Sequence, residues 1–190
     1  MLEAGLGTGK QGTESQECPV DGNFVTFISR IQSPALQAVA RSWDAARGSK
    51  RLASWRDVGS SILPPYSRQL WSYAYDAGTG EFTGRSAATS IAKWVNEEVL
   101  GRPLKDLLPP ASFQEAELLL TRIVKNPLAC RSFGRLFRAG DEVVTGERIV
   151  LPVAADGKTG DGVLGASNYA IPALLGSWEL FYDNIEWYEI

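Results

Sequence analysis

Residues 130–169 read CRSFGRLFRAGDEVVTGERIVLPVAADGKTGDGVLGASNY. The pattern predicts three strands, at Cys130–Arg138, Val143–Val153 and Gly162–Tyr169. The two connections, at residues 139–141 and 156–158, are short and contain glycine. Connections of hairpin length favour antiparallel pairing, so we expect one antiparallel sheet in this part of the chain.

Two further strands and two helices are predicted upstream of this stretch. Trp71–Asp76 and Glu81–Arg85 look like a hairpin around a turn that contains glycine. Ser86–Asn96 is predicted to be helical, and a second helix is predicted to begin at Ser112, which has capping-box spacing to Glu115. Strands grouped at both ends with helices between them are typical of an α+β fold. We therefore expect a five-stranded antiparallel sheet with these helices on one face.

A flanking helix is predicted ahead of the sheet. Ser33 is a suitable N-cap, Pro34 suits the first helical position, and Gly48 ends the pattern. Four apolar residues share one face of this helix: Leu36, Val39, Ala40 and Trp43. We expect this face to pack against a second copy of the chain in a homodimer, because a symmetric pair is the simplest closed arrangement.

The chain divides into three parts by composition. Residues 1–22 are rich in glycine and polar residues and predict a disordered leader, and residues 23–171 contain the predicted domain. Residues 172–190 form an acidic, aromatic tail, since no basic residue follows Lys158. A tail with so many aromatic side chains is expected to dock on its own domain or on a second copy.

The absence of certain residue types excludes several kinds of site. The 190 residues include two cysteines and no histidine, and the only methionine is Met1. Catalytic sites of the Ser-His-Asp and Cys-His kinds are therefore excluded, as are zinc and haem sites with histidine ligands. We expect no haem, zinc or flavin, and we find no assembled catalytic site.

Charge and hydropathy give expectations about location and partners. The formal net charge is −3, which gives no reason to expect a nucleic-acid partner. No apolar run approaches the roughly 18 residues that a membrane helix requires, and the N-terminus lacks the order of a signal peptide. Two distant cysteines fit a reducing compartment. We therefore expect a cytoplasmic protein without membrane insertion.

Several segments resemble a bacterial family of stand-alone PAS-type proteins. The strongest similarity is in ERIVLPVAADG at Glu147–Gly157, followed by VLG at Val163–Gly165. The stretch GRPLKDL at Gly101–Leu107 is similar to the family's turn into its middle helices, and Trp43 and Arg47 match its first helix. The resemblance covers about Ser33–Ile171. It implies a PAS fold, a role in sensing or regulation, and a ligand of unassigned identity.

The chain departs from this family where the first middle helix begins. The family usually has a Gly-Thr pair there, whereas this chain has RSAAT at Arg85–Thr89. Contacts made by that pair therefore cannot be carried over to this sequence.

Four residues are predicted to bind a ligand: Arg85, Thr89, Trp94 and Arg148. In a PAS fold, Arg85 would lie at the rim of the cavity, where its guanidinium could hold a carboxylate or simply face solvent. Trp94 could line the pocket or fill the core. Arg148 could bind an acidic ligand group, or it could form a structural ion pair with Glu147.

Cys130 is the remaining candidate for chemistry. It could be a redox-sensing thiol or a haem thiolate, but its only activating neighbour in sequence is Arg131. A thiol without an electropositive surrounding stays protonated, so we expect an inert, half-buried strand residue.

These patterns support three functional hypotheses. The first is a non-enzymatic sensory module that binds a small ligand or a protein partner and signals in trans, by shifting the arrangement of the Ser33–Arg47 helix. The second is a small α+β enzyme of the hydrolase or isomerase kind, with carboxylates in a cone-shaped cavity. The third is an interaction module with a solid core. A carboxylate of raised pKa deep in the pocket would favour the enzyme.

Overall fold

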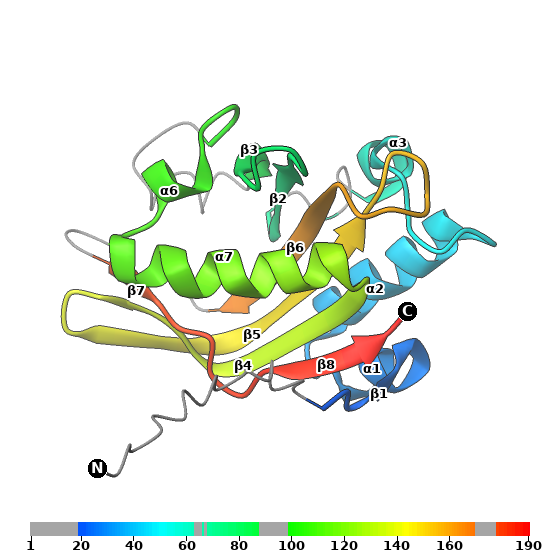
Figure 1. Ribbon diagram of the computed structural model, residues 1–190. Coiled ribbons are helices and arrows are strands. Elements are labelled where there is room, and N and C mark those ends of the chain that lie inside the picture. The colour runs from blue at the N-terminus through cyan, green and yellow to red at the C-terminus, as the bar shows by residue number, and fades with distance from the viewer. Residues whose placement is uncertain (1–18, 63–65, 67, 88–98, 170–177) are drawn as a thin grey trace, which may run out of the picture.

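The structure is a computed structural model that describes residues 19–62, 66, 68–87, 99–169 and 178–190. One twisted sheet lies between helices on both of its faces (Figure 1). The strands are β1 (Gly22–Asn23), β2 (Leu70–Tyr75), β3 (Phe82–Ala87), β4 (Leu128–Ala139), β5 (Glu142–Val153), β6 (Gly162–Tyr169), β7 (Trp178–Leu180) and β8 (Glu186–Glu189). The helices are α1 (Phe24–Arg30), α2 (Pro34–Arg47), α3 (Trp55–Asp57), the π-helical turn η1 (Val58–Ile62), α6 (Leu104–Leu107) and α7 (Pro110–Lys125).

The sheet has eight strands in the described part of the chain, in the order β1-β8-β4-β5-β6-β2-β3, with β7 also paired to β4. The five predicted strands form β2 to β6, and all of their pairings are antiparallel. The prediction of five strands was nevertheless wrong, because β1, β7 and β8 extend the sheet. The pairing of β1 with β8 is parallel, so the sheet is not wholly antiparallel.

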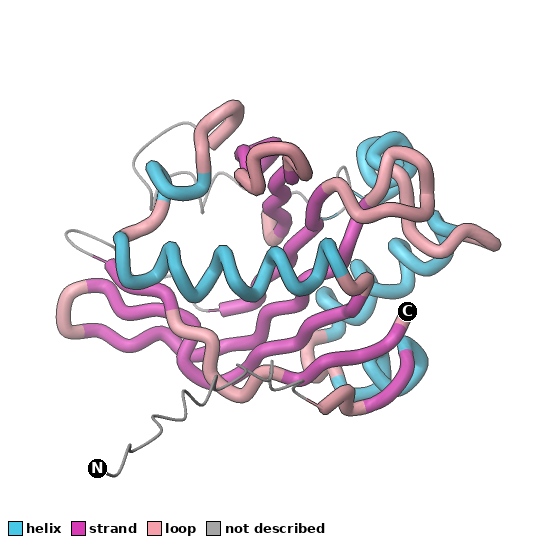
Figure 2. The backbone as a smooth tube through the Cα atoms, viewed as in Figure 1, coloured by secondary structure: helices cyan, strands magenta, loops and turns pink. Residues whose placement is uncertain are grey.

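Alternation along β5 divides the core into two layers. Ile149 and Leu151 pack with the helices α1 and α2, whereas Val150 packs with α7 on the opposite face. Figure 2 shows α7 lying across one side of the sheet and the N-terminal helices on the other side. Successive residues of a strand point to opposite faces, so a strand covered on both faces is apolar at nearly every position.

Helix α2 forms with the predicted caps. The Ser33 hydroxyl accepts a hydrogen bond from the amide of Leu36, and Gly48 adopts a positive φ of 56° at the C-terminal end. Trp43 is fully buried, and its indole Nε1 donates to the carbonyl of Pro152 at 3.1 Å. The apolar face of α2 therefore packs on the chain's own sheet. The homodimer stays a prediction, and it would need a different surface.

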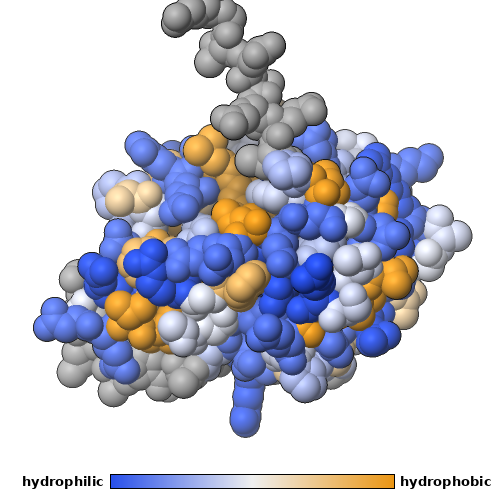
Figure 3. Space-filling view, turned by 90° about the horizontal axis from the view of Figure 1, so that it is seen from below, coloured by the Kyte–Doolittle hydropathy of each residue, from blue (hydrophilic) through white to orange (hydrophobic). Residues whose placement is uncertain are grey.

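Exposed apolar residues are scattered over the lower side of the molecule. In Figure 3, apolar patches on that side are separated by polar and charged residues. Large apolar side chains that are exposed include Val25 and Leu118, which lie on different helices. Scattered apolar residues of this kind are normal on a soluble protein surface.

Helix α7 begins two residues before the predicted position. It begins at Pro110, after Pro109 at the N-cap position, and no side chain caps it. The predicted cap at Ser112 was therefore wrong, because the Ser112 hydroxyl instead accepts a hydrogen bond from the amide of Leu180 at 2.9 Å. In the predicted helix Ser86–Asn96, the first two residues belong to β3, and residues 88–96 lie outside the described part of the chain.

The described part of the acidic, aromatic tail, residues 178–190, docks on its own domain, and residues 172–177 lie outside the described residues. Strand β7 pairs with the far end of β4, and β8 pairs with the beginning of β4. Residues 178–190 therefore run along the β4 edge of the sheet. Of the predicted leader, residues 1–18 lie outside the described residues.

We expect Leu120→Ala to lower the free energy of unfolding by about 2–5 kcal/mol, the usual cost of truncating a buried leucine. Leu120 is 1% exposed, whereas Leu118 on the same helix is 74% exposed. Leu118→Ala is the matched control and should change stability by less than about 0.5 kcal/mol. Urea denaturation of both variants tests this, and equal midpoints would contradict the packing of α7.

Candidate functional site

A cavity of about 70 Å³ lies between the sheet, α6 and α7. Its lining on the sheet comes from the central strands β2, β5 and β6, through Trp71, Tyr73, Arg148, Ser167 and Tyr169. The helical side and the C-terminal segment contribute mostly apolar residues: Leu104, Leu108, Ala116, Leu120, Trp178, Leu180 and Tyr182.

The strand residues reach the cavity because of period-two alternation. Trp71 and Tyr73 are two positions apart on β2, as are Ser167 and Tyr169 on β6, so each pair shares a face. Gly165 lies opposite Trp71 in the β2–β6 register, and a Cβ atom there would come within 2.1 Å of the indole ring. A side chain at this position would therefore displace the indole ring.

The C-terminal segment lines one side of the cavity. The amide of Leu180 donates to the Ser112 hydroxyl on α7, and the amide of Phe181 donates to the carbonyl of Leu136 at 2.9 Å. These bonds hold Trp178 and Tyr182 against the cavity, where both contribute to the lining.

Arg148 is the only cationic residue among the described residues that line the cavity. It is 4% exposed, and its guanidinium lies 5.0 Å from the centre of the Tyr182 ring. Its Nη1 donates to the carbonyl of Phe181 at 3.4 Å, and its Nη2 donates to the carbonyl of Leu136 at 3.5 Å. Both distances are at the long limit for a hydrogen bond, so these contacts are weak.

The phenols of the cavity are held in their neutral form. Burial raises the pKa of Tyr73, Tyr169 and Tyr182, and the positive charge of Arg148 opposes this only in part. At neutral pH the cavity therefore presents hydroxyl groups that can donate hydrogen bonds beside one positive charge.

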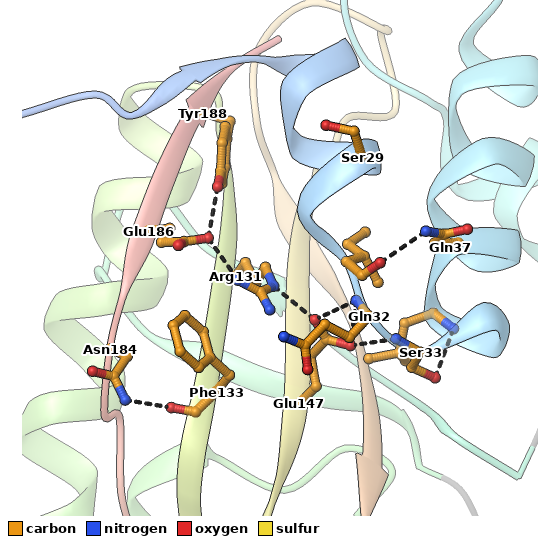
Figure 4. Close-up of polar contacts among 12 residues, drawn as sticks. Ser29, Gln32, Ser33, Gln37, Arg131, Phe133, Glu147, Asn184, Glu186 and Tyr188 are labelled. Atoms are coloured by element: carbon orange, nitrogen blue, oxygen red, sulfur yellow. Dashed lines mark hydrogen bonds and ion pairs between the residues drawn. The ribbon is translucent and has the colours of Figure 1, made fainter.

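Glu147, the neighbour of Arg148, points to the opposite face of β5 and joins a buried polar network (Figure 4). Its carboxylate accepts hydrogen bonds from the amides of Gln32 and Ser33, the shortest being 2.7 Å. It also pairs with Arg131 on β4 at 2.6 Å, which in turn pairs with Glu186 on β8 at 2.8 Å. Glu147 and Arg148 therefore do not form the ion pair that their adjacency in sequence suggested.

Glu186 and Tyr188 complete this network on β8. The Tyr188 hydroxyl donates to Glu186 at 2.6 Å. Burial acts to raise the pKa of Glu186, but hydrogen bonds from Tyr188 and Arg131 outweigh it and hold that pKa below its ordinary value. Glu186 therefore keeps its negative charge beside Arg131 at neutral pH.

The structure describes two of the four predicted ligand residues, Arg148 and Arg85, and places them differently. Arg148 lines the cavity. Arg85 is exposed on β3, and its guanidinium lies 4.3 Å from the centre of the Trp55 ring. Thr89 and Trp94 lie outside the described residues. Ligand binding by these residues stays a prediction.

Sequence reasoning missed most of the cavity lining. Trp71, Tyr73, Ser167 and Tyr169 lie on predicted strands, and their spacing of two positions could have assigned each pair to one face. Nothing local in the sequence places the tail residues Trp178 and Tyr182 beside them.

Cys130 lies inside β4 and is 1% exposed. Burial raises the pKa of its thiol to about 12, so the thiol is protonated at neutral pH. Cys130 is thus fully rather than half buried, and its inertness stays a prediction. Among the described residues, no cluster of metal-ligating side chains is present. No helix in the described part of the chain is long and apolar enough to cross a bilayer.

Comparison with known proteins gives one match. A family model described as PAS domain matches residues 31–168, which is more than half of the chain. No curated protein and no solved structure matches the sequence.

We expect Glu147→Gln to lower the free energy of unfolding by about 1.5–3 kcal/mol, the range for hydrogen bonds to charged groups, because it weakens the bonds from Arg131 and two amides. Glu142→Gln is the matched control, since Glu142 is exposed at the start of the same strand. Urea denaturation at neutral pH measures both. Equal stability of the two variants would show that the network contributes nothing.

Proposed function

This chain belongs to the PAS domain family, and on that premise we propose that it is a sensory module that binds a small molecule in the cavity between α7 and the sheet. Family membership indicates a sensory or regulatory domain in general terms. The observation that carries the finer proposal is a cavity with an apolar lining and one buried guanidinium. Ligand sites are commonly pockets of this kind, mostly apolar with a few convergent polar groups.

Binding is favoured over catalysis by the groups that line the cavity. No carboxylate is among the described lining residues, and the raised pKa values there belong to tyrosines. Protonated phenols and a guanidinium offer no base at neutral pH. The hypothesis of an enzyme with carboxylates in its cavity therefore gains no support from these residues.

The cavity also argues against a module with a solid core. One water molecule needs about 10–15 Å³ on this scale. A cavity of about 70 Å³ beside Arg148 and Ser167 is larger than that and partly polar. Space of this size next to a buried charge is better suited to a ligand than to packing alone.

The proposed signal crosses the sheet through β5 and acts in trans on a protein partner. Arg148 faces the cavity, while the adjacent Glu147 holds the amides of Gln32 and Ser33 at the start of α2. A ligand that favours one position of β5 would shift the population of α2 arrangements. The free, buried thiol of Cys130 supports a cytoplasmic location for this module.

The test is native mass spectrometry of the protein purified, without denaturation, from the cells that naturally produce it. We expect the unaltered chain to carry a small molecule. The matched variant is Ala116→Leu, which extends a cavity-lining side chain on α7 into the space, and it should be recovered without that mass. A spectrum that shows the protein alone, or equal retention by both proteins, would contradict the proposal.

A further inference from the structure

The two buried arginines on β4 and β5 differ in their ion-pair partners. Arg131 is 2% exposed and forms ion pairs with Glu147 and Glu186, at 2.6 Å and 2.8 Å. Arg148 is 4% exposed, and no carboxylate among the described residues lies within ion-pair distance of it. Two guanidiniums of similar burial on neighbouring strands therefore differ in charge compensation.

A buried charge without a counter-charge is costly for a protein. Removing one partner of a buried pair strongly destabilises a fold, because the remaining charge is left uncompensated. Arg148 donates two long hydrogen bonds, to the carbonyls of Leu136 and Phe181. A carbonyl oxygen carries only a partial negative charge, so these bonds do not balance the charge of the guanidinium. The guanidinium has five N–H donors, so it retains capacity for a further acceptor.

We propose that the ligand of this cavity is a short-chain monocarboxylate, whose carboxylate pairs with Arg148 and whose apolar chain lies against Trp71 and Leu120. This proposal rests on the proposed function, since it assigns a chemical class to the same site. A guanidinium offers two parallel N–H donors, which match the two oxygens of a carboxylate.

The charge of the ligand follows from the lining. Arg148 is the one cation among the described lining residues, so one negative charge balances it and a second would be left unpaired in an apolar surrounding. The neutral hydroxyls of Tyr73 and Tyr182 add hydrogen-bond donors without adding charge. A phosphate dianion is therefore a poorer match than a monocarboxylate.

The size of the ligand follows from the volume. An engineered apolar cavity of about 150 Å³ holds benzene, and this cavity measures about 70 Å³. A ligand of a few carbon atoms suits a space of this volume. Butyrate, an unbranched four-carbon acid, is a suitable probe, and butyramide is its uncharged counterpart of nearly the same shape.

The experiment is isothermal titration calorimetry of the full chain with sodium butyrate, butyramide and sodium chloride at matched ionic strength. We expect butyrate to bind and butyramide to bind at least about thirtyfold more weakly, the lower end of the loss for a buried charge pair. Equal binding of the two probes would overturn the role of Arg148. Equal heats from chloride and butyrate would show a general anion site and overturn the role of the apolar chain.

Three variants locate the binding. Arg148→Met should weaken butyrate binding by about the same factor as the loss of charge in butyramide. Arg41→Met is the matched control, because Arg41 is exposed on α2 at the opposite face of the sheet, and it should bind butyrate like the unaltered chain. Ala116→Leu keeps Arg148 but fills the cavity, and it should not bind. Butyrate binding that survives Arg148→Met or Ala116→Leu would overturn the proposal.

The outcomes separate this inference from the proposed function. If butyramide binds as well as butyrate and Ala116→Leu abolishes both, the cavity is a ligand site but the carboxylate assignment is wrong. If butyrate does not bind at all, the monocarboxylate proposal fails, while native mass spectrometry still decides whether the cavity holds some other molecule. If Arg148→Met does not fold, comparison of the two probes on the unaltered chain still decides the role of charge.

Discussion

The rest of the structure depends on the buried carboxylate of Glu147. It binds the amides that precede α2, pairs with Arg131 on β4, and through Arg131 reaches Glu186 on β8. The Glu147 carboxylate therefore links β5, β4 and β8 to the segment that precedes α2. Removing one member of such a network leaves other buried polar groups without partners. The intact network therefore favours a single arrangement of these elements.

The position beside Glu147 has the opposite role because a strand alternates its faces. Arg148 points toward α7 and into the cavity, where the described residues provide no carboxylate for it. One dipeptide of β5 thus gives a compensated charge that stabilises the fold and an uncompensated charge suited to a ligand. Because the two residues are adjacent in the chain and face opposite sides of the sheet, the path across the sheet in the proposed sensor would be short.

The C-terminal segment lies beyond the range of the family match. The family match ends at residue 168, yet Trp178, Leu180 and Tyr182 line the cavity and β8 carries Glu186. Part of the proposed ligand site and part of the buried network therefore come from residues outside the matched range. Ligand preference, on this view, would depend on a segment that the family pattern does not describe.

The sequence by itself determined the elements whose signals are local: the caps of α2, the hairpin turns, the five strands β2 to β6, and the exclusion of histidine-based chemistry. The sequence also indicated Arg148 as a candidate residue, but it did not indicate that Arg148 and Glu147 point to opposite faces of the sheet. Only the tertiary structure decided the places of β1, β7 and β8, the use of Ser112 by Leu180, and the partners of Glu147. The amide of Gln32 is 115 positions from Glu147, and contacts at such separations follow from packing of the whole chain, because no local pattern specifies which distant residue will satisfy a buried charge.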